Sequence, residues 1–225
     1  MAAAGPKWLY LHGFASGPGS AKGVAVAQHF AACGLEVERL NLRRPSLERL
    51  RLSAILVEVR RAIGGSADRA VLFGSSLGGL AAARVAEDDA RVCALVLLAP
   101  GFRIAERFRL RMGEGAFARW RESGWLETLD YTTKQPARID FGFIEDAAES
   151  DARNGGWPDV RVPTLVIHGR QDDTCDIALS REWASGKRHV RLVEVEDGHP
   201  LTQSLPVILR ESEKFLAPFL GDDAG

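Results

Sequence analysis

The sequence predicts an α/β protein in which helices cover both faces of a mostly parallel, twisted sheet. Short apolar runs alternate along the chain with longer stretches of helical pattern. Runs that are apolar throughout are typical of parallel strands buried between two layers of helices. The length of 225 residues suits one compact domain, so we expect a single domain over residues 1–225.

Six short apolar runs are the expected strands, and turn signals bound most of them. In chain order they comprise residues 8–11, 37–42, 70–73, 94–99, 164–167 and 190–195. The first and fifth runs end in His-Gly pairs, and the third leads straight into Gly74. The second run is the weakest of the six.

Helical patterns fill the spaces between these runs. Apolar residues recur at roughly helical spacing between Leu47 and Ile63, and Gly64 ends that stretch. Residues 77–87 are rich in alanine, so a helix there can pack tightly against the sheet. Residues 205–220 are expected to form the closing helix.

The stretch from about residue 102 to residue 158 breaks this alternation. It is too long for a plain loop and is rich in arginine and aromatic residues. We interpret residues 102–158 as a mostly helical lid, inserted after the strand at 94–99.

Composition and charge exclude several classes of partner. The net charge of -1 gives no reason to expect a nucleic acid, and no apolar stretch approaches the roughly 18 residues that cross a membrane. The first seven residues lack the features of a signal peptide. The three cysteines (Cys33, Cys93 and Cys175) form no CxxC pair, which favours free thiols in a reducing compartment. We expect a cytoplasmic protein with no membrane partner.

Ser76 is the candidate nucleophile. A serine hydroxyl needs an exposed position and an adjacent base. The segment Gly74-Ser75-Ser76-Leu77-Gly78 lies between an expected strand and an expected helix, and its outer glycines permit the sharp turn that would raise Ser76 above the sheet. Ser75 is flanked differently and does not fit the pattern.

His199 is the candidate base, because it follows the last expected strand and precedes the closing helix. The other histidines compete poorly with it. His12 and His168 end strands in His-Gly pairs, so a structural role at the edge of the site suits them. His29 lies in an early helical pattern, and His189 precedes a strand, where a surface role is expected.

Asp172 is the candidate acid that would orient this imidazole, since it lies in the turn after the strand at 164–167. Asp173 stays in reserve, and Asp176 is expected to cap a helix. The order Ser76, Asp172, His199 is that of the α/β-hydrolases and differs from the other two known triad orders.

The oxyanion of a tetrahedral intermediate needs two backbone N–H donors. Leu77 is one candidate because it follows the nucleophile at a helix N-terminus, and Phe14, in the loop after the first strand, is the other. The glycine-rich loop around Lys22 lacks the spacing of a nucleotide-binding Walker A motif. No metal-binding motif is present in the sequence, so no metal is expected.

The same residues resemble a known family. Residues 9–22, with their Leu-Tyr-Leu-His-Gly-Phe stretch, are similar to the opening of the small YqiA-like bacterial esterases. Residues 74–79 match the nucleophile turn of that family, and Gly198-His199 match its histidine turn. The His-Gly-x-x-Asp stretch ending at Asp172 resembles the acid turn of the wider superfamily, although Cys175-Asp176 stands where Val-Pro is usual. The resemblance implies the α/β-hydrolase fold and carboxylic-ester hydrolysis without a cofactor.

These observations predict a serine hydrolase that cleaves carboxylic esters or thioesters through an acyl-enzyme. An acyltransferase of the same fold and a catalytically idle binding protein are the alternatives. The aromatic residues of the expected lid, among them Trp120 and Trp125, suggest an apolar acyl or aryl pocket. Its arginines could meet a carboxylate or phosphate of the substrate, but a solvated helical face is the preferred interpretation.

Overall fold

The computed structural model describes residues 5–220 of the chain and contains two sheets. The larger sheet has six parallel strands: β1 (Lys7–Leu11), β2 (Val37–Leu40), β3 (Ala70–Ser75), β4 (Val92–Leu98), β7 (Thr164–Gly169) and β8 (Val190–Val195). Their order across the sheet is β2-β1-β3-β4-β7-β8. The predicted α/β class and all six predicted strands are confirmed. Residues 1–4, part of the stretch in which no signal peptide is expected, lie outside the described residues.

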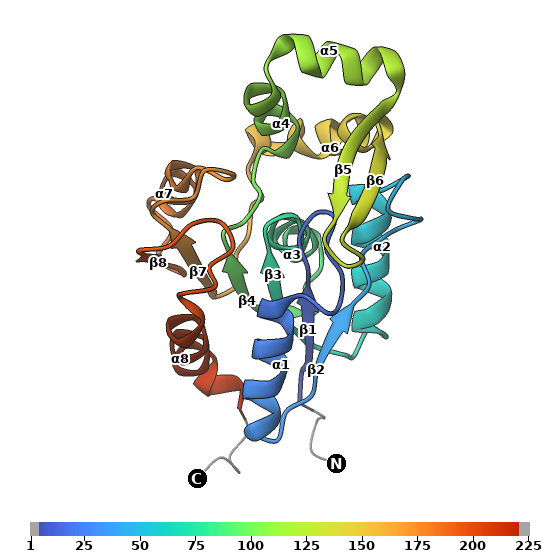
Figure 1. The fold of residues 1–225 in the computed structure, drawn as a ribbon. Helices are drawn as coiled ribbons and strands as arrows, with labels where there is room; N and C mark the ends of the chain where they lie inside the picture. The colour runs from blue at the N-terminus through green and yellow to red at the C-terminus, as the bar shows by residue number, and fades with distance from the viewer. Residues whose placement is uncertain (1–4, 221–225) are drawn as a thin grey trace.

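Helices cover both faces of this sheet (Figure 1). They are α1 (Ala21–Ala32), α2 (Leu52–Ile63), α3 (Leu77–Asp88), α7 (Ile177–Ala184) and α8 (Leu205–Leu216). Helices α1 and α8 pack on one face, and α2 and α3 pack on the other. Among residues 5–220, none of the helices has the length and apolar character needed to span a bilayer.

Alternation along the strands divides the core into two apolar clusters, one on each face of the sheet. On β1, Leu9 and Leu11 belong to the cluster that includes the buried residues of α2 and α3. Trp8 and Tyr10 belong to the cluster that includes those of α1 and α8. Because both faces are covered, every residue of β3 and β4 is buried, which explains why these strands read as continuous apolar runs.

Two predicted helix boundaries were wrong. Helix α2 begins at Leu52 because Arg51 is extended, with φ −137° and ψ 130°. Leu50 belongs to the preceding loop and is buried, so its position fits the apolar spacing of a helix although this segment is not helical. Helix α8 ends at Leu216 and a 3₁₀ turn, η2 (Ala217–Phe219), follows, because a proline inside the last turn would cost a backbone hydrogen bond.

The 102–158 insertion leaves the sheet after β4 and returns before β7. It contains α4 (Ile104–Met112), α5 (Glu114–Ser123), α6 (Gly142–Asp151), the 3₁₀ turn η1 (Arg153–Gly156), and an antiparallel hairpin of β5 (Trp125–Asp130) and β6 (Gln135–Asp140). The three helices agree with the prediction of a mostly helical insertion, but the hairpin was not predicted. The hairpin has few buried residues, so its sequence lacks the apolar alternation that marks a strand.

The hairpin is attached to the rest of the molecule close to the end of β1. The Tyr131 N–H donates to the carbonyl of Ala15 at 2.9 Å. Arg43, which follows β2, forms a two-pronged ion pair with Asp130 at 2.6 and 2.8 Å. The insertion therefore contacts the loop that follows β1, in addition to its chain connections to β4 and β7.

Candidate active site

The carboxyl ends of the parallel strands lie at one edge of the sheet, and four sequence-predicted site residues follow these ends. Phe14 follows β1, Ser76 follows β3, Asp172 follows β7 and His199 follows β8. In open α/β sheets this edge is where ligands bind. Ser76 and His199, which are 123 positions apart in sequence, meet because their strands end at this edge.

Ser76 occupies a strained turn between β3 and α3. Its φ of 52° and ψ of −115° are uncommon for a residue with a side chain. The turn is also crowded, because a Cβ at Gly74 would overlap the backbone of Gly78, and a Cβ at Gly78 would overlap that of Leu11. The Gly-x-Ser-x-Gly spacing is thus explained by two close backbone approaches, which set Ser76 at the start of α3.

Ser76, His199 and Asp172 form a continuous chain of contacts. The Oγ of Ser76 lies 3.1 Å from Nε2 of His199, and Nδ1 of His199 lies 2.7 Å from Oδ2 of Asp172. The Asp172 side chain is completely buried, whereas that of His199 is 20% exposed. The structure therefore brings together the three residues that the sequence suggests as nucleophile, base and acid.

Asp172 is held as a carboxylate. Burial alone would raise its pKa, but hydrogen bonds from His168, His199 and the N–H of Cys175 outweigh burial and hold the pKa well below its usual range. The Oδ1 oxygen accepts from the backbone N–H groups of Thr174 and Cys175 at 2.9 and 2.7 Å. A carboxylate fixed in this way can orient the His199 ring and stabilise its charged form.

The position of the proton on neutral His199 follows from its neighbours. Since Asp172 is an acceptor, Nδ1 carries the hydrogen and Nε2 is free to accept the proton of Ser76. Burial disfavours the imidazolium, but the interactions with Asp172 and the neighbouring Cys175 outweigh burial and raise the pKa of His199 to about 9.

The two reserve aspartates have other roles. Asp173 is exposed and accepts a hydrogen bond from the hydroxyl of Thr174 at 3.0 Å. Asp176 caps α7, as expected, by accepting from the N–H of Ala178 at 2.8 Å. Neither carboxylate contacts His199.

Leu77 and the loop that carries Phe14, the two predicted oxyanion donors, both lie next to Ser76. Leu77 begins α3 directly after Ser76, and the loop that carries Phe14 passes beside Ser76, since a Cβ at Gly13 would lie 3.4 Å from that of Ser76. Within residues 5–220, neither backbone N–H has a hydrogen-bond partner. Unpaired N–H groups beside a nucleophile are what a developing oxyanion requires.

His12 holds the Phe14 loop against the segment that follows β2. Its Nδ1–H donates to the carbonyl of Gly13 at 2.9 Å, and its Nε2 accepts from the N–H of Leu42 at 3.0 Å. Burial lowers the pKa of His12 to about 4, so the ring is neutral and can play both parts. The structural role expected for this histidine is therefore observed.

Two residues outside the predicted triad support the site. His168 is completely buried, and its Nε2 lies 3.1 Å from Asp172, so it contacts the triad directly and does not merely border it. Lys22 donates to the carbonyl of His199 at 3.4 Å, and burial lowers the pKa of its amine to about 8. The structural role expected for His168 at the edge of the site is thus a contact with Asp172. Lys22 was not found from the sequence, because its loop was considered only as a nucleotide-binding motif.

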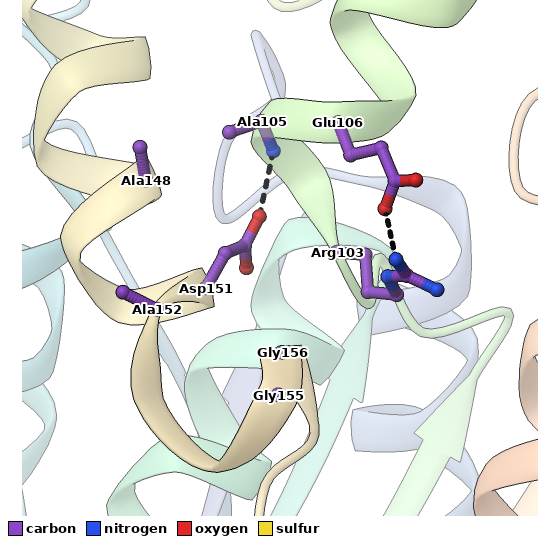
Figure 2. A pocket seen from close by; sticks show the side chains of 8 residues that line it. All are labelled: Arg103, Ala105, Glu106, Ala148, Asp151, Ala152, Gly155 and Gly156. Atoms are coloured by element: carbon purple, nitrogen blue, oxygen red, sulfur yellow. Dashed lines mark hydrogen bonds and ion pairs between the residues drawn. The ribbon is translucent and has the colours of Figure 1, made fainter.

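A cavity of about 280 Å³ lies elsewhere, between the start of α4, the end of α6 and η1 (Figure 2). Its wall includes Asp151, which accepts from the N–H of Ala105 at 2.9 Å, and Arg103, which pairs with Glu106 at 2.6 Å. None of the predicted site residues lines it. The cavity belongs to the attachment of the insertion.

The parallel sheet, the strained serine turn and the Ser-Asp-His order define a protein of the α/β-hydrolase fold. Solved structures share this fold along nearly the whole chain. Alpha/beta hydrolase domain-containing protein 10 from mouse is 18% identical with a TM-score of 0.78, and the match covers 97% of this chain and 92% of the mouse chain. Est1E from Butyrivibrio proteoclasticus, solved with ferulic acid bound, is 18% identical with a TM-score of 0.77 over 96% of this chain and 89% of Est1E. An esterase domain from Rhodothermus marinus is 19% identical with a TM-score of 0.67 over 98% and 90% of the two chains.

The chain belongs to the uncharacterised protein family UPF0227, whose family model matches residues 7–211. This membership confirms the family resemblance predicted from residues 9–22 and 74–79. No curated protein matches the sequence.

Proposed function

We propose that this protein is a serine hydrolase that cleaves carboxylic esters or thioesters. The observation that carries the proposal is the chain of contacts from Ser76 through His199 to a fully buried Asp172. A hydroxyl within reach of an imidazole, which is itself oriented by a carboxylate, is the arrangement that activates a serine for acyl transfer.

The reaction proceeds in two steps. His199 takes the proton of Ser76 as Oγ attacks the carbonyl carbon, and the N–H groups of Leu77 and Phe14 stabilise the oxyanion. His199 then gives that proton to the leaving alcohol or thiol, and an acyl-enzyme on Ser76 remains. Water attacks the acyl-enzyme with His199 again as base, which releases the acid and restores the free serine.

The similar proteins support this chemistry without deciding the substrate. Est1E was solved with ferulic acid, and the Rhodothermus marinus protein is described as an esterase domain. Both support hydrolysis at a carboxylic ester as the reaction to test first. Insertions vary between proteins of one fold more than the sheet does, so the shared fold does not identify the natural ester. That ester has to be sought with the intact protein.

The decisive experiment compares two neighbouring serines. Ser76→Ala should lower the rate on 4-nitrophenyl butyrate by several orders of magnitude and abolish labelling by a fluorophosphonate probe, with an unchanged thermal melt. Ser75→Ala is the matched control and should retain both activities. Hydrolysis by Ser76→Ala at the wild-type rate would overturn the mechanism, and absence of labelling of the wild type would favour an idle binding protein.

A single product analysis separates hydrolysis from transfer. With an added primary alcohol in the reaction, a hydrolase should release mainly the free acid. A new ester as the main product would instead assign the same triad to an acyltransferase.

A further inference from the structure

Arg107 joins the insertion to the loop that carries Asp172. It lies on α4 and is half-buried. Its Nε donates to the carbonyl of Phe102 at 2.8 Å, and its Nη1 donates to the carbonyl of Thr174 at 2.9 Å. Two hydrogen bonds to main-chain atoms fix a planar guanidinium in one orientation.

The third nitrogen of Arg107 lies beside the candidate nucleophile. A Cβ built on Gly101 would be 3.0 Å from Nη2 of Arg107 and 3.2 Å from the carbonyl carbon of Ser76. Gly101 itself donates its N–H to the carbonyl of Ser76 at 2.9 Å. Because Gly101 has no side chain, the guanidinium can lie close to the backbone of Ser76.

Within residues 5–220, Nη2 of Arg107 has no hydrogen-bond acceptor and no carboxylate pairs with this guanidinium. Two neighbouring arginines do have carboxylate partners: Arg103 pairs with Glu106 at 2.6 Å, and Arg109 pairs with Glu114 at 2.7 Å. Asp151 interacts with Arg107 electrostatically but accepts no hydrogen bond from it, so the half-buried Nη2 keeps free donors that an anion can bind. A solvated helical face was expected for the arginines of the insertion, whereas Arg107 is half-buried.

The neighbouring residue on α4 supplies an apolar surface. The ring of Phe108 packs edge-on against Phe14 at 5.4 Å, and Phe14 also contacts Phe143 at 5.3 Å. Consecutive residues of one helix thus direct a cation towards Gly101 and an aromatic ring towards Phe14.

We propose that Arg107 binds a carboxylate of the substrate, so that the ester cleaved at Ser76 carries a negative charge close to the scissile bond. This inference rests on the proposed function of Ser76. Nη2 keeps both of its hydrogens free and can donate a charge-assisted hydrogen bond to a carboxylate oxygen. A phosphate dianion is usually held by more donors than this one nitrogen offers.

The test uses two pairs of esters that differ in charge. On the acyl side, mono-4-nitrophenyl glutarate is compared with 4-nitrophenyl valerate. On the leaving-group side, the butyrate ester of 4-hydroxybenzoate is compared with that of 4-hydroxybenzamide. The wild type should prefer the anionic member of at least one pair by kcat/KM, and the responding pair shows which side of the substrate meets Arg107.

Three variants separate binding from packing. Arg107→Met should lower kcat/KM for the anionic ester roughly 10- to 100-fold relative to its neutral partner, the range expected for lost charge-assisted hydrogen bonds. Arg107→Lys should restore part of the preference because it keeps the charge. Arg109→Met is the matched control, since Arg109 is exposed and paired on the same helix, and it should change neither ester.

Two results would overturn the inference while the proposed function stands. One is an equal loss on both esters in Arg107→Met, which would make Arg107 a purely structural link. The other is a wild type that hydrolyses neutral and anionic esters equally well through Ser76. A wild type that hydrolyses none of the four esters would instead count against the proposed function itself.

Discussion

His168 and His199 contact the same carboxylate oxygen, Oδ2 of Asp172, at 3.1 and 2.7 Å. Nε2 of His168 also lies 2.8 Å from the carbonyl of Cys175, and since both neighbours are acceptors, this nitrogen carries the hydrogen. Nδ1 of His168 lies 2.8 Å from the hydroxyl of Ser180. A second imidazole, buried and fixed by its own partners, therefore positions the carboxylate that orients His199.

Replacing His168 should damage the reaction more than substrate binding. We expect His168→Leu to lower kcat roughly 10- to 100-fold with little change in KM, because Asp172 loses a donor and with it a fixed orientation. His168→Gln keeps an N–H donor and should retain more activity at a similar melting temperature. Steady-state kinetics and melts of both variants are the measurement. Equal kcat in the two variants would reduce His168 to a packing role.

We expect kcat/KM to increase with pH through the alkaline range. His199 must be neutral in the free enzyme to accept the proton of Ser76, so kcat/KM should fall as the pH drops below its pKa of about 9. The Asp172→Asn variant loses the negative charge that favours the imidazolium, so the pKa of His199 should be lower. Its much weaker activity should therefore decline at a lower pH than that of the wild type. Rates on a neutral ester between pH 6 and 10 test both. An unchanged pH dependence in Asp172→Asn would mean that another group controls it.

Phe108 and Trp120 should behave differently when replaced, although both are aromatic residues of the insertion. Phe108 contacts Phe14 next to the site, whereas Trp120 is 2% exposed and donates its indole N–H to the carbonyl of Ile139. Phe108→Ala should shift the preference of 4-nitrophenyl esters towards longer acyl chains several-fold, because it opens space beside Phe14. The control Trp120→Phe should lower stability and leave the preference unchanged. The same shift in both variants would contradict this division.

The Arg43–Asp130 ion pair should stabilise the attachment of the hairpin. Its side chains are 19% and 9% exposed, so Asp130→Asn should lower the free energy of unfolding by about 1–3 kcal/mol. The Arg43 guanidinium holds the pKa of Asp130 well below its usual range. The stabilisation should therefore be full above the ordinary aspartate pKa and decline as pH falls through the lowered one.

The matched control for this pair is Asp159→Asn. The Arg161–Asp159 pair is 85% and 54% exposed, and its loss should cost less than about 0.5 kcal/mol. Urea unfolding of both variants at pH 7 and at pH 3.5 gives the comparison. Equal losses for the two variants at pH 7 would show that the hairpin attachment does not depend on this ion pair.

Local patterns predicted some elements well and others poorly. The strands β3 and β4 were recognisable because both of their faces are buried, so their residues are apolar throughout. The hairpin of β5 and β6 was missed because most of its residues are exposed and carry no such pattern. The start of α2 was misjudged because Leu50 is buried from a loop at a position that also fits a helix.

The sequence by itself determined the fold class, the serine turn and the order of Ser76, Asp172 and His199. These depend on short-range features: apolar runs, and glycines where the backbone approaches closely. Only the tertiary structure decided which side chains meet, such as His168 with Asp172, and Arg107 with the neighbourhood of Ser76. Such contacts depend on how loops from separate strands converge at one sheet edge, and no local pattern in the chain encodes that convergence.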